Sequence, residues 1–162
     1  MTLSLRPMTD DEVARYIAVG LDEYVAQYAA SSGESEGEVR RKAEEQYTSY
    51  FPDGRPAPGH QLMIMESNGD AVGQTWVGPH PQRPGASDAA WLYNIEIDEE
   101  LRGRGYGRRC LDLVEAHLAQ QGVTELGLNV FSDNNAARGL YASSDYREVA
   151  VTMTKVLPHR SS

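Results

Sequence analysis

The sequence has one cysteine, no long apolar run and a shortage of basic residues, and each absence excludes a class of protein. With Cys110 alone, neither an intrachain disulfide nor a multi-cysteine metal site can form, and we expect a small buried side chain. No uninterrupted apolar stretch approaches the roughly 20 residues of a membrane-spanning helix. The four histidines show no metal-ligand spacing such as HExxH, so no metal site is predicted.

The net charge of the chain excludes further classes of binding partner. Acidic residues outnumber basic ones by 24 to 15, which gives a formal net charge of −9. Binding to nucleic acid or to an acidic membrane needs a basic surface, so we expect neither partner, whereas a cationic substrate is favoured. The first residues lack the basic and apolar order of a signal peptide, and we expect a cytoplasmic protein.

A length of 162 residues with 40% hydrophobic content predicts one globular domain, residues 1–162. The order of elements is typical of the α/β class, with a mostly antiparallel start. Asn68-Gly69-Asp70 suits the tight turn of a hairpin, and Thr9 suits the N-cap of the first helix. Strands are expected at Leu3–Arg6, Gln61–Glu66, Ala71–Val77, Ala90–Ile97, Glu125–Phe131 and Arg147–Val156. Helices are expected around Val13, Ile17 and Leu21 and at Glu38–Tyr50, Tyr106–Gln121 and Asn134–Ala142.

A glycine-rich segment lies between the strand that ends at Ile97 and the helix that begins near Tyr106. It reads Arg102-Gly103-Arg104-Gly105-Tyr106-Gly107. Glycine lets backbone amides approach a ligand closely, and a helix start adds unpaired N–H groups and the positive end of the helix dipole. Nearby arginines add charge-assisted hydrogen bonds. The segment therefore predicts a phosphate or pyrophosphate ligand, with a simple helix-entry turn as the alternative.

Spacing distinguishes between the phosphate-binding motifs that contain such glycines. A P-loop needs GxxxxGK followed by Ser or Thr, which is absent. A dinucleotide fingerprint needs GxGxxG, but its last position falls on Arg108 when counted from Gly103 and on Cys110 when counted from Gly105. The pattern that fits is Arg/Gln-x-x-Gly-x-Gly, with Arg102, Gly105 and Gly107. A nucleotide-binding module that uses the same loop remains a rival interpretation.

This pattern resembles the pyrophosphate loop of the GCN5-related N-acetyltransferase (GNAT) superfamily. A second segment, in which Asn134, Ala137 and Leu140-Tyr141 keep the spacing of a later motif of that family, follows in the same order. The resemblance covers residues 90–150 and implies a mixed, twisted central sheet with flanking helices. It also implies acetyl-CoA as the cosubstrate and a primary amine of a small molecule or peptide as the acceptor. A monomer and a homodimer both remain open.

The resemblance also implies a cofactor site. In the family, pantetheine bonds to the free edge of a central strand, and the matching positions here are Ile95, Glu96 and Ile97. An N–H near Ile97 would polarise the thioester carbonyl, as an oxyanion hole does. Residues 102–107 would hold the diphosphate, and Asn134 would cap its helix and reach the cofactor.

Catalytic roles follow for two residues. Tyr141 matches the acid of the family, and a phenol pKa near ~10 suits donation to a thiolate of pKa near ~8.5. The alternative for Tyr141 is an apolar helix residue that faces the core. Glu96 is the candidate base, directly or through water, and its alternative is a solvated strand carboxylate. Direct attack in a ternary complex is expected, without an acetylated Cys110.

Two departures from the family pattern qualify this reading. Asn129 stands where some relatives have a glutamate, and an amide is no base. Asp145 stands where relatives have glycine after the helix, and Asp adopts the left-handed conformation only at a modest energetic cost. These departures keep a noncatalytic acyl-CoA-binding sensor as the alternative function.

Overall fold

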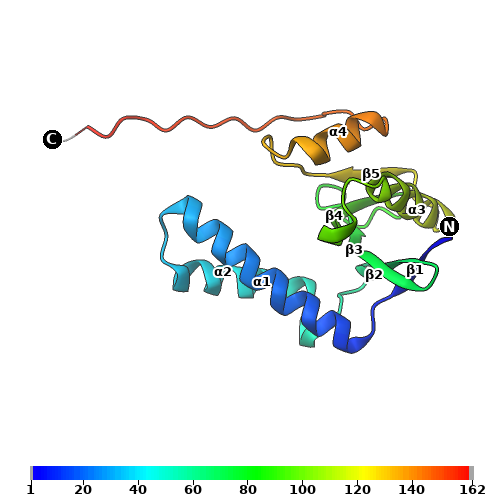
Figure 1. Ribbon diagram of the computed structural model, residues 1–162. Coiled ribbons are helices and arrows are strands. Elements are labelled where there is room, and N and C mark those ends of the chain that lie inside the picture. The colour runs from blue at the N-terminus through cyan, green and yellow to red at the C-terminus, as the bar shows by residue number, and fades with distance from the viewer. Residues whose placement is uncertain (1, 161–162) are drawn as a thin grey trace. The chain divides into compact units, whose positions relative to one another are not determined.

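The computed structural model describes residues 2–160 of the chain (Figure 1). Its contacts divide it into two compact units, Met1–Asn129 and Val130–Ser162, and each unit is described by itself. The first unit contains the sheet and the helices α1 to α3, and the second contains α4. That the whole chain forms one domain stays a prediction.

The elements of the first unit follow the predicted order closely. Its strands are β1 (Leu3–Pro7), β2 (Gln61–Ser67), β3 (Asp70–Pro79), β4 (Ala89–Ile97) and β5 (Glu125–Leu128). Its α-helices are α1 (Asp10–Ser32), α2 (Glu36–Tyr50) and α3 (Tyr106–Gln120). Short 3-10 turns occupy Pro52–Gly54 and Glu99–Leu101.

The sheet has the order β1-β2-β3-β4-β5 and is mixed, as expected. Strands β1 to β4 pair with one another in antiparallel fashion, and β5 runs parallel to β4. The hairpin between β2 and β3 is confirmed. Asn68 and Gly69 both have positive φ, 53° and 87°, which is the signature of the primed turn that Asn-Gly favours.

The first helix begins at the residue that the sequence indicates. The Thr9 hydroxyl accepts a hydrogen bond from the Glu12 amide at 3.2 Å, and the Glu12 carboxylate accepts one from the Thr9 amide at 3.1 Å. Arg6 then donates to Glu12 and to Glu66, at 2.9 and 2.7 Å, and the hydrogen bond from Arg6 lowers the pKa of Glu12. This reciprocal capping fixes where the chain turns from β1 into α1.

Two apolar clusters cover opposite faces of the sheet. On the face of α1 and α2, the buried side chains are Val13, Phe51, Leu62 and Trp76. On the face of α3, Cys110 packs with buried Met65 and Val72. The prediction that Cys110 is buried is therefore confirmed. Strand β4 lies between these two clusters and contributes residues to both faces of the sheet.

The second unit begins with α4 (Asn135–Ser143), whose N-cap is Asn134. The helix ends in a Schellman arrangement, in which the Tyr146 amide donates to the Tyr141 carbonyl at 3.0 Å and the Asp145 amide to the Ala142 carbonyl at 3.4 Å. Asp145 has a φ of 67°, the left-handed conformation that glycine usually supplies. The helix end that was expected at Asp145 therefore forms without a glycine.

Two expectations about strands are wrong. No strand forms in residues 147–156, where the chain runs extended beyond α4 (Figure 1) and leaves Val149 and Met153 86% and 88% exposed. The alternating apolar pattern is typical of a strand, but a strand also needs a neighbour for its ladder, and none among residues 2–160 pairs with this segment. β5 likewise ends at Leu128 rather than Phe131, because its ladder with β4 ends there.

Candidate active site

The outer edge of β4 is open along half of its length. Its ladder with β5 stops at Leu92, and no other strand of the described residues pairs with this edge beyond that point. On the inner side, the Asp98 amide donates to the Val72 carbonyl of β3 at 2.9 Å. Because amide directions alternate along a strand, the N–H groups of Ile95 and Ile97 point away from β3, toward the open edge.

A β-bulge changes the side-chain pattern of β4. Trp76 pairs with Asn94 and Val77 pairs with Leu92, so Tyr93 is an extra residue without a partner on β3. The bulge brings Tyr93 and Asn94 to the same face of the sheet. The rings of Trp76 and Tyr93 stack there with centroids 4.5 Å apart.

Two polar side chains of β4 lie on the face of α1 and α2, because they pair with Trp76 and Gln74 there. The Asn94 amide donates to the Tyr16 hydroxyl at 3.0 Å, and the Glu96 carboxylate accepts from the Gln74 amide at 3.2 Å. Ile95, between them, packs into the opposite cluster. Glu96 is 44% exposed, so its carboxylate is accessible from solvent.

The glycine loop, residues 102–107, leads from β4 into α3. Gly103 and Gly105 have φ of 77° and 80°, the left-handed region that side chains disfavour. The N-cap of α3 is Gly105, which has no side chain to cap the helix, and no acid lies in its first turn. The other two helices of this unit have caps, Thr9 and Ser35, and acidic first turns. The start of α3 therefore has neither a side-chain cap nor an acidic residue in its first turn, and the positive end of its dipole favours an anion.

Arg102 joins the glycine loop to the open edge. Its Nε donates to the Ile97 carbonyl at 3.0 Å, and its Nη2 lies 3.7 Å from Glu96 Oε1. The structure thus brings together the predicted base, the predicted strand edge and the predicted diphosphate loop. Three further arginines are exposed around the start of α3, where the sequence predicts arginines near the ligand: Arg104, Arg108 and Arg109.

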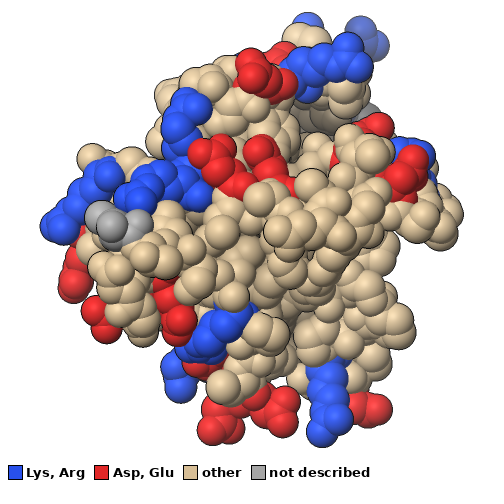
Figure 2. Space-filling model, turned by 90° about the vertical axis from the view of Figure 1, so that its right-hand side faces the viewer, with Lys and Arg blue, Asp and Glu red and all other residues tan. Residues whose placement is uncertain are grey.

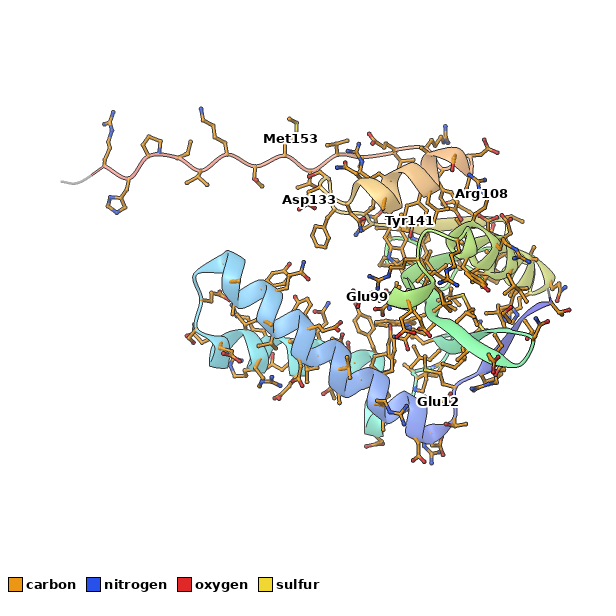
Figure 3. The ribbon with its side chains drawn as sticks, viewed as in Figure 1. Glu12, Glu99, Arg108, Asp133, Tyr141 and Met153 are labelled. Carbon is orange, nitrogen blue, oxygen red and sulfur yellow. The ribbon has the colours of Figure 1, made fainter. Side chains whose placement is uncertain are left out.

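The remaining predicted residues, Asn134 and Tyr141, lie in the second unit. Asn134 caps α4, because its side chain accepts from the Ala137 amide at 3.2 Å. Figure 3 shows Tyr141 on this helix, and its ring lies 5.5 Å from that of Tyr146. Burial raises the pKa of the Tyr141 phenol, so the hydroxyl stays protonated over the neutral range.

Cys110 is buried and takes no part in this arrangement. Burial raises the pKa of its thiol to about 11, which suppresses the reactive thiolate. We expect the native chain to resist a disulfide reagent at pH 8 and to react with one equivalent after unfolding, as measured by thiol absorbance. Rapid labelling of the native chain would contradict this burial.

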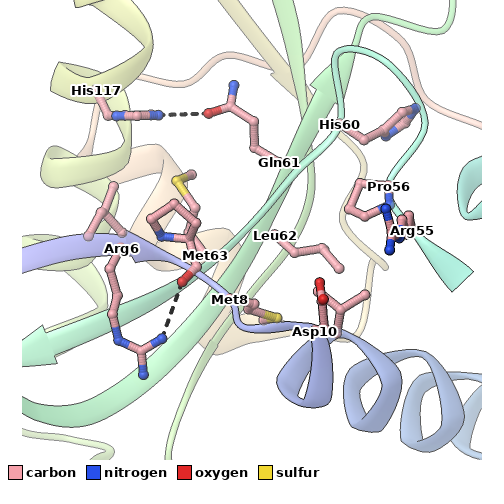
Figure 4. Close-up of a pocket in the computed structure, with 13 residues that line it drawn as sticks. Arg6, Met8, Asp10, Arg55, Pro56, His60, Gln61, Leu62, Met63 and His117 are labelled. Carbon is pink, nitrogen blue, oxygen red and sulfur yellow. Dashed lines mark hydrogen bonds between the residues drawn. The ribbon is translucent and has the colours of Figure 1, made fainter.

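A separate pocket of about 390 Å³ lies at β1 and β2, near the start of α1 (Figure 4). Arg6, Asp10, His60, Gln61 and His117 contribute its polar groups, and His117 Nε2 lies 2.8 Å from Gln61 Oε1. None of the predicted site residues lines it. The pocket is therefore distinct from the candidate active site.

Two kinds of feature are absent from residues 2–160. No helix there is both long and apolar enough to cross a membrane. No group of three or more His, Cys, Asp or Glu side chains is placed to hold a metal ion within the same residues. Acidic and basic side chains both occur on the face drawn in Figure 2.

Comparison with known proteins identifies the family. The model of the acetyltransferase (GNAT) family matches residues 21–146. The chain belongs to this family, which confirms the resemblance found in the sequence, and it is an acyltransferase of the N-acetyltransferase type. Members of this family use acetyl-CoA.

Individual relatives agree with this assignment over nearly the whole chain. The chain is 28% identical to the uncharacterized N-acetyltransferase YycN of Bacillus subtilis (strain 168), over 97% of this chain and 100% of the relative. YdgE of the same strain, also an uncharacterized N-acetyltransferase, is 27% identical over 97% and 99%. The YycN crystal structure matches with a TM-score of 0.84 at 26% identity, covering 98% and 100%.

A more distant structure shares the fold alone. It is that of AAC(6')-Iy in complex with the bisubstrate analogue CoA-S-monomethyl-acetylneamine. It matches with a TM-score of 0.55 at 13% identity, covering 98% of this chain and 100% of the other.

Tyr16 and Asn94 are polar residues of this site that the sequence patterns did not indicate. Their hydrogen bond joins positions 78 residues apart, so no pattern of neighbouring residues indicates it. Side chains alternate between the two faces of a strand, so Asn94 is expected on the same face as Glu96, two residues away. This alternation is the one sequence signal that could have indicated Asn94.

Proposed function

We propose that this chain transfers the acetyl group of acetyl-CoA to the primary amine of a small molecule or peptide, by direct attack in a ternary complex. The observation that carries the proposal is the continuous arrangement in the first unit. An open strand edge with outward amides is linked through Arg102 to an uncapped helix start surrounded by arginines. The net charge of −9 supports a cationic acceptor.

In this proposal, acetyl-CoA contacts both the glycine loop and the open edge of β4. The amides of residues 103–107 and the arginines beside them bind the diphosphate. The edge at Ile95 and Ile97 pairs with pantetheine, and an amide of that edge polarises the thioester carbonyl. Asn134 supplies a further polar group from the cap of α4. AAC(6')-Iy, which shares the fold, was solved with the bisubstrate analogue CoA-S-monomethyl-acetylneamine, and this supports CoA as the ligand.

The proposed chemistry needs two proton movements. Before either, the ammonium group of the acceptor loses one proton to solvent. The neutral nitrogen then attacks the carbonyl carbon of the thioester, so that a C–N bond forms as the C–S bond breaks. Glu96 accepts the amine proton, directly or through one water, and Tyr141 donates a proton to the departing thiolate. The products are an N-acetyl amine and free CoA.

Thiol detection tests the proposal directly. Purified chain, acetyl-CoA and a panel of primary amines are expected to release free CoA thiol at a rate that depends on the amine. The matching appearance of N-acetyl amine is followed by mass spectrometry. Stabilisation by acetyl-CoA without thiol release from any amine would overturn the proposal in favour of a noncatalytic sensor, and stronger protection by ATP or NAD than by CoA would favour a nucleotide-binding module.

Replacing Glu96 by Gln tests the base. We expect Glu96→Gln to lower kcat by about tenfold to a hundredfold, since the amide cannot accept the proton but water can in part replace the carboxylate. Glu99→Gln makes the same change of charge in an exposed turn three residues along and is expected to leave kcat within about twofold. Equal rates for both variants would remove Glu96 from the mechanism.

A further inference from the structure

Two hydrogen-bond acceptors flank the amide of Ile95 on the face of α1 and α2. They are the side-chain oxygen of Asn94 and the carboxylate of Glu96, which lie on the same face and two residues apart. Two residues of a strand span roughly 6.5 Å, so one nitrogen between these side chains can lie within about 3 Å of both oxygens. Such a nitrogen would be next to the open edge of β4.

Tyr16 fixes the orientation of Asn94. The Asn94 Nδ2 donates to the Tyr16 hydroxyl at 3.0 Å, which leaves Asn94 Oδ1 as the remaining acceptor. Among residues 2–160, the one buried side-chain N or O atom without a hydrogen-bond partner is Ser144 Oγ, so Asn94 Oδ1 is not a buried orphan. Tyr16 itself is anchored, because its ring packs edge-on against Trp76 with centroids 6.4 Å apart.

Burial of Tyr16 keeps its hydroxyl neutral by raising the pKa of the phenol. Burial is the main cause that raises the pKa of this phenol, and the charge of Glu96 raises it further, while the hydrogen bond from Asn94 lowers it. A neutral hydroxyl accepts from Asn94 at every physiological pH. The orientation of the Asn94 amide is therefore maintained in the absence of a ligand.

We infer that Asn94, oriented by Tyr16, binds the acceptor amine together with Glu96 and selects primary amines over secondary ones. This inference deepens the proposed function and rests on it. A neutral primary amine has two N–H groups and one lone pair. When Asn94 Oδ1 and Glu96 accept the two N–H groups, the lone pair is left to face the thioester at the edge of β4. A secondary amine has one N–H group and leaves one of the two oxygens without a donor.

The role of Asn94 leaves the balance of the reaction unchanged. The nitrogen forms its bond to the acetyl carbon while the C–S bond breaks. Glu96 takes the proton of one N–H group, and the N–H group that Asn94 holds stays on the amide product. Asn94 therefore contacts the substrate without exchanging a proton, and Tyr16 is a positioning residue that acts through Asn94.

The test compares Asn94→Ala, Tyr16→Phe and the double variant in the full chain. The probes are phenethylamine, spermidine and a tripeptide amide with a free α-amine, each with its N-methyl analogue, and the fastest pair is used. We expect Asn94→Ala to raise KM for the primary amine about tenfold, the equivalent of one lost hydrogen bond, and to reduce the preference over the N-methyl amine. Tyr16→Phe is expected to act in the same direction, and to add nothing in the Asn94→Ala background.

Tyr93→Phe is the matched control. It removes a hydroxyl on the same face that donates to the Pro79 carbonyl at 2.9 Å, and it is expected to leave KM and the amine preference unchanged. Calorimetry is expected to give the same acetyl-CoA Kd for every variant. Tyr16→Phe keeps the packed ring, so this variant still tests the inference if Asn94→Ala fails to fold.

The outcomes separate this inference from the proposed function. Wild-type turnover with an unchanged KM and an unchanged primary preference in both single variants would overturn the inference alone. Additive effects in the double variant would overturn the role of Tyr16. A wild-type chain that releases no thiol with any probe would overturn the proposed function, and the inference with it.

Discussion

The substitution Tyr141→Phe is expected to lower kcat by about a hundredfold to a thousandfold while the Kd of acetyl-CoA stays unchanged. The proposed role of the phenol is to protonate the thiolate of CoA, and the lost proton affects the reaction more than the binding. Burial raises the pKa of Tyr141, so the acid form persists across neutral pH. Since an acid acts only while protonated, loss of this proton should lower wild-type kcat only above the ordinary phenol pKa of about 10. Thiol release measured against pH, together with calorimetric Kd values, checks both statements.

The neighbouring Tyr146 supplies the control for this substitution. Its ring is 5.5 Å from that of Tyr141 in the same unit, so Tyr146→Phe removes a second phenol from the same surroundings. We expect Tyr146→Phe to keep kcat within about twofold. Unchanged turnover in Tyr141→Phe would show that another group protonates the thiolate.

The substitution Gly105→Ala is expected to raise the Kd of acetyl-CoA by about tenfold or more. Gly105 has a φ of 80°, and a side chain there destabilises the loop conformation by about 1–2 kcal/mol. Apart from its chain neighbours, an added Cβ meets no heavy atom within 4 Å, so it enters open space beside the amides that we propose bind the diphosphate. A loss of about 1.4 kcal/mol in binding corresponds to tenfold in Kd. Calorimetric titration with acetyl-CoA measures the change.

Gly33→Ala separates loop strain from ligand contact. Gly33 is the C-cap of α1, has a φ of 73° and likewise has no atom within 4 Å of an added Cβ. The two variants should therefore lose similar stability, about 1–2 kcal/mol, in thermal unfolding. Only Gly105→Ala is expected to weaken acetyl-CoA binding. Equal Kd values for the two variants would mean that the glycine loop does not hold the diphosphate.

The parts of this fold that could be predicted from the sequence are those with local causes. The Asn68-Gly69 turn follows from the backbone freedom of those two residues, and the start of α1 follows from the reciprocal bonds of Thr9 and Glu12. The glycine loop is predictable for the same reason. Its left-handed residues, Gly103 and Gly105, lie immediately before a helix that no side chain caps.

The parts that could not be predicted depend on distant partners. Residues 147–156 have the alternation of a strand, yet whether a ladder forms depends on a neighbour elsewhere in the chain. The ring of Tyr93, the extra residue of the bulge, stacks on Trp76 and also contacts Tyr50 of α2. Neither contact has a signal in the residues around position 93.

The candidate site likewise contains residues that could be predicted from local motifs and residues that could not. Glu96 and Arg102 were found from motif positions, and the structure adds that they lie 3.7 Å apart. Tyr16 and Asn94 were missed, because one belongs to α1 and the other to the bulged strand. The roles of Tyr141 and Asn134 in the second unit stay predictions, and the Tyr141→Phe variant tests the first of them.

The measurement that tests the central claim most directly is a calorimetric titration of the purified wild-type chain with acetyl-CoA. We predict a saturable heat, abolished when excess CoA occupies the glycine loop beforehand, and a matching rise in the melting temperature. A titration without heat, together with an unchanged melting temperature, would contradict the assignment of residues 102–107 to the diphosphate.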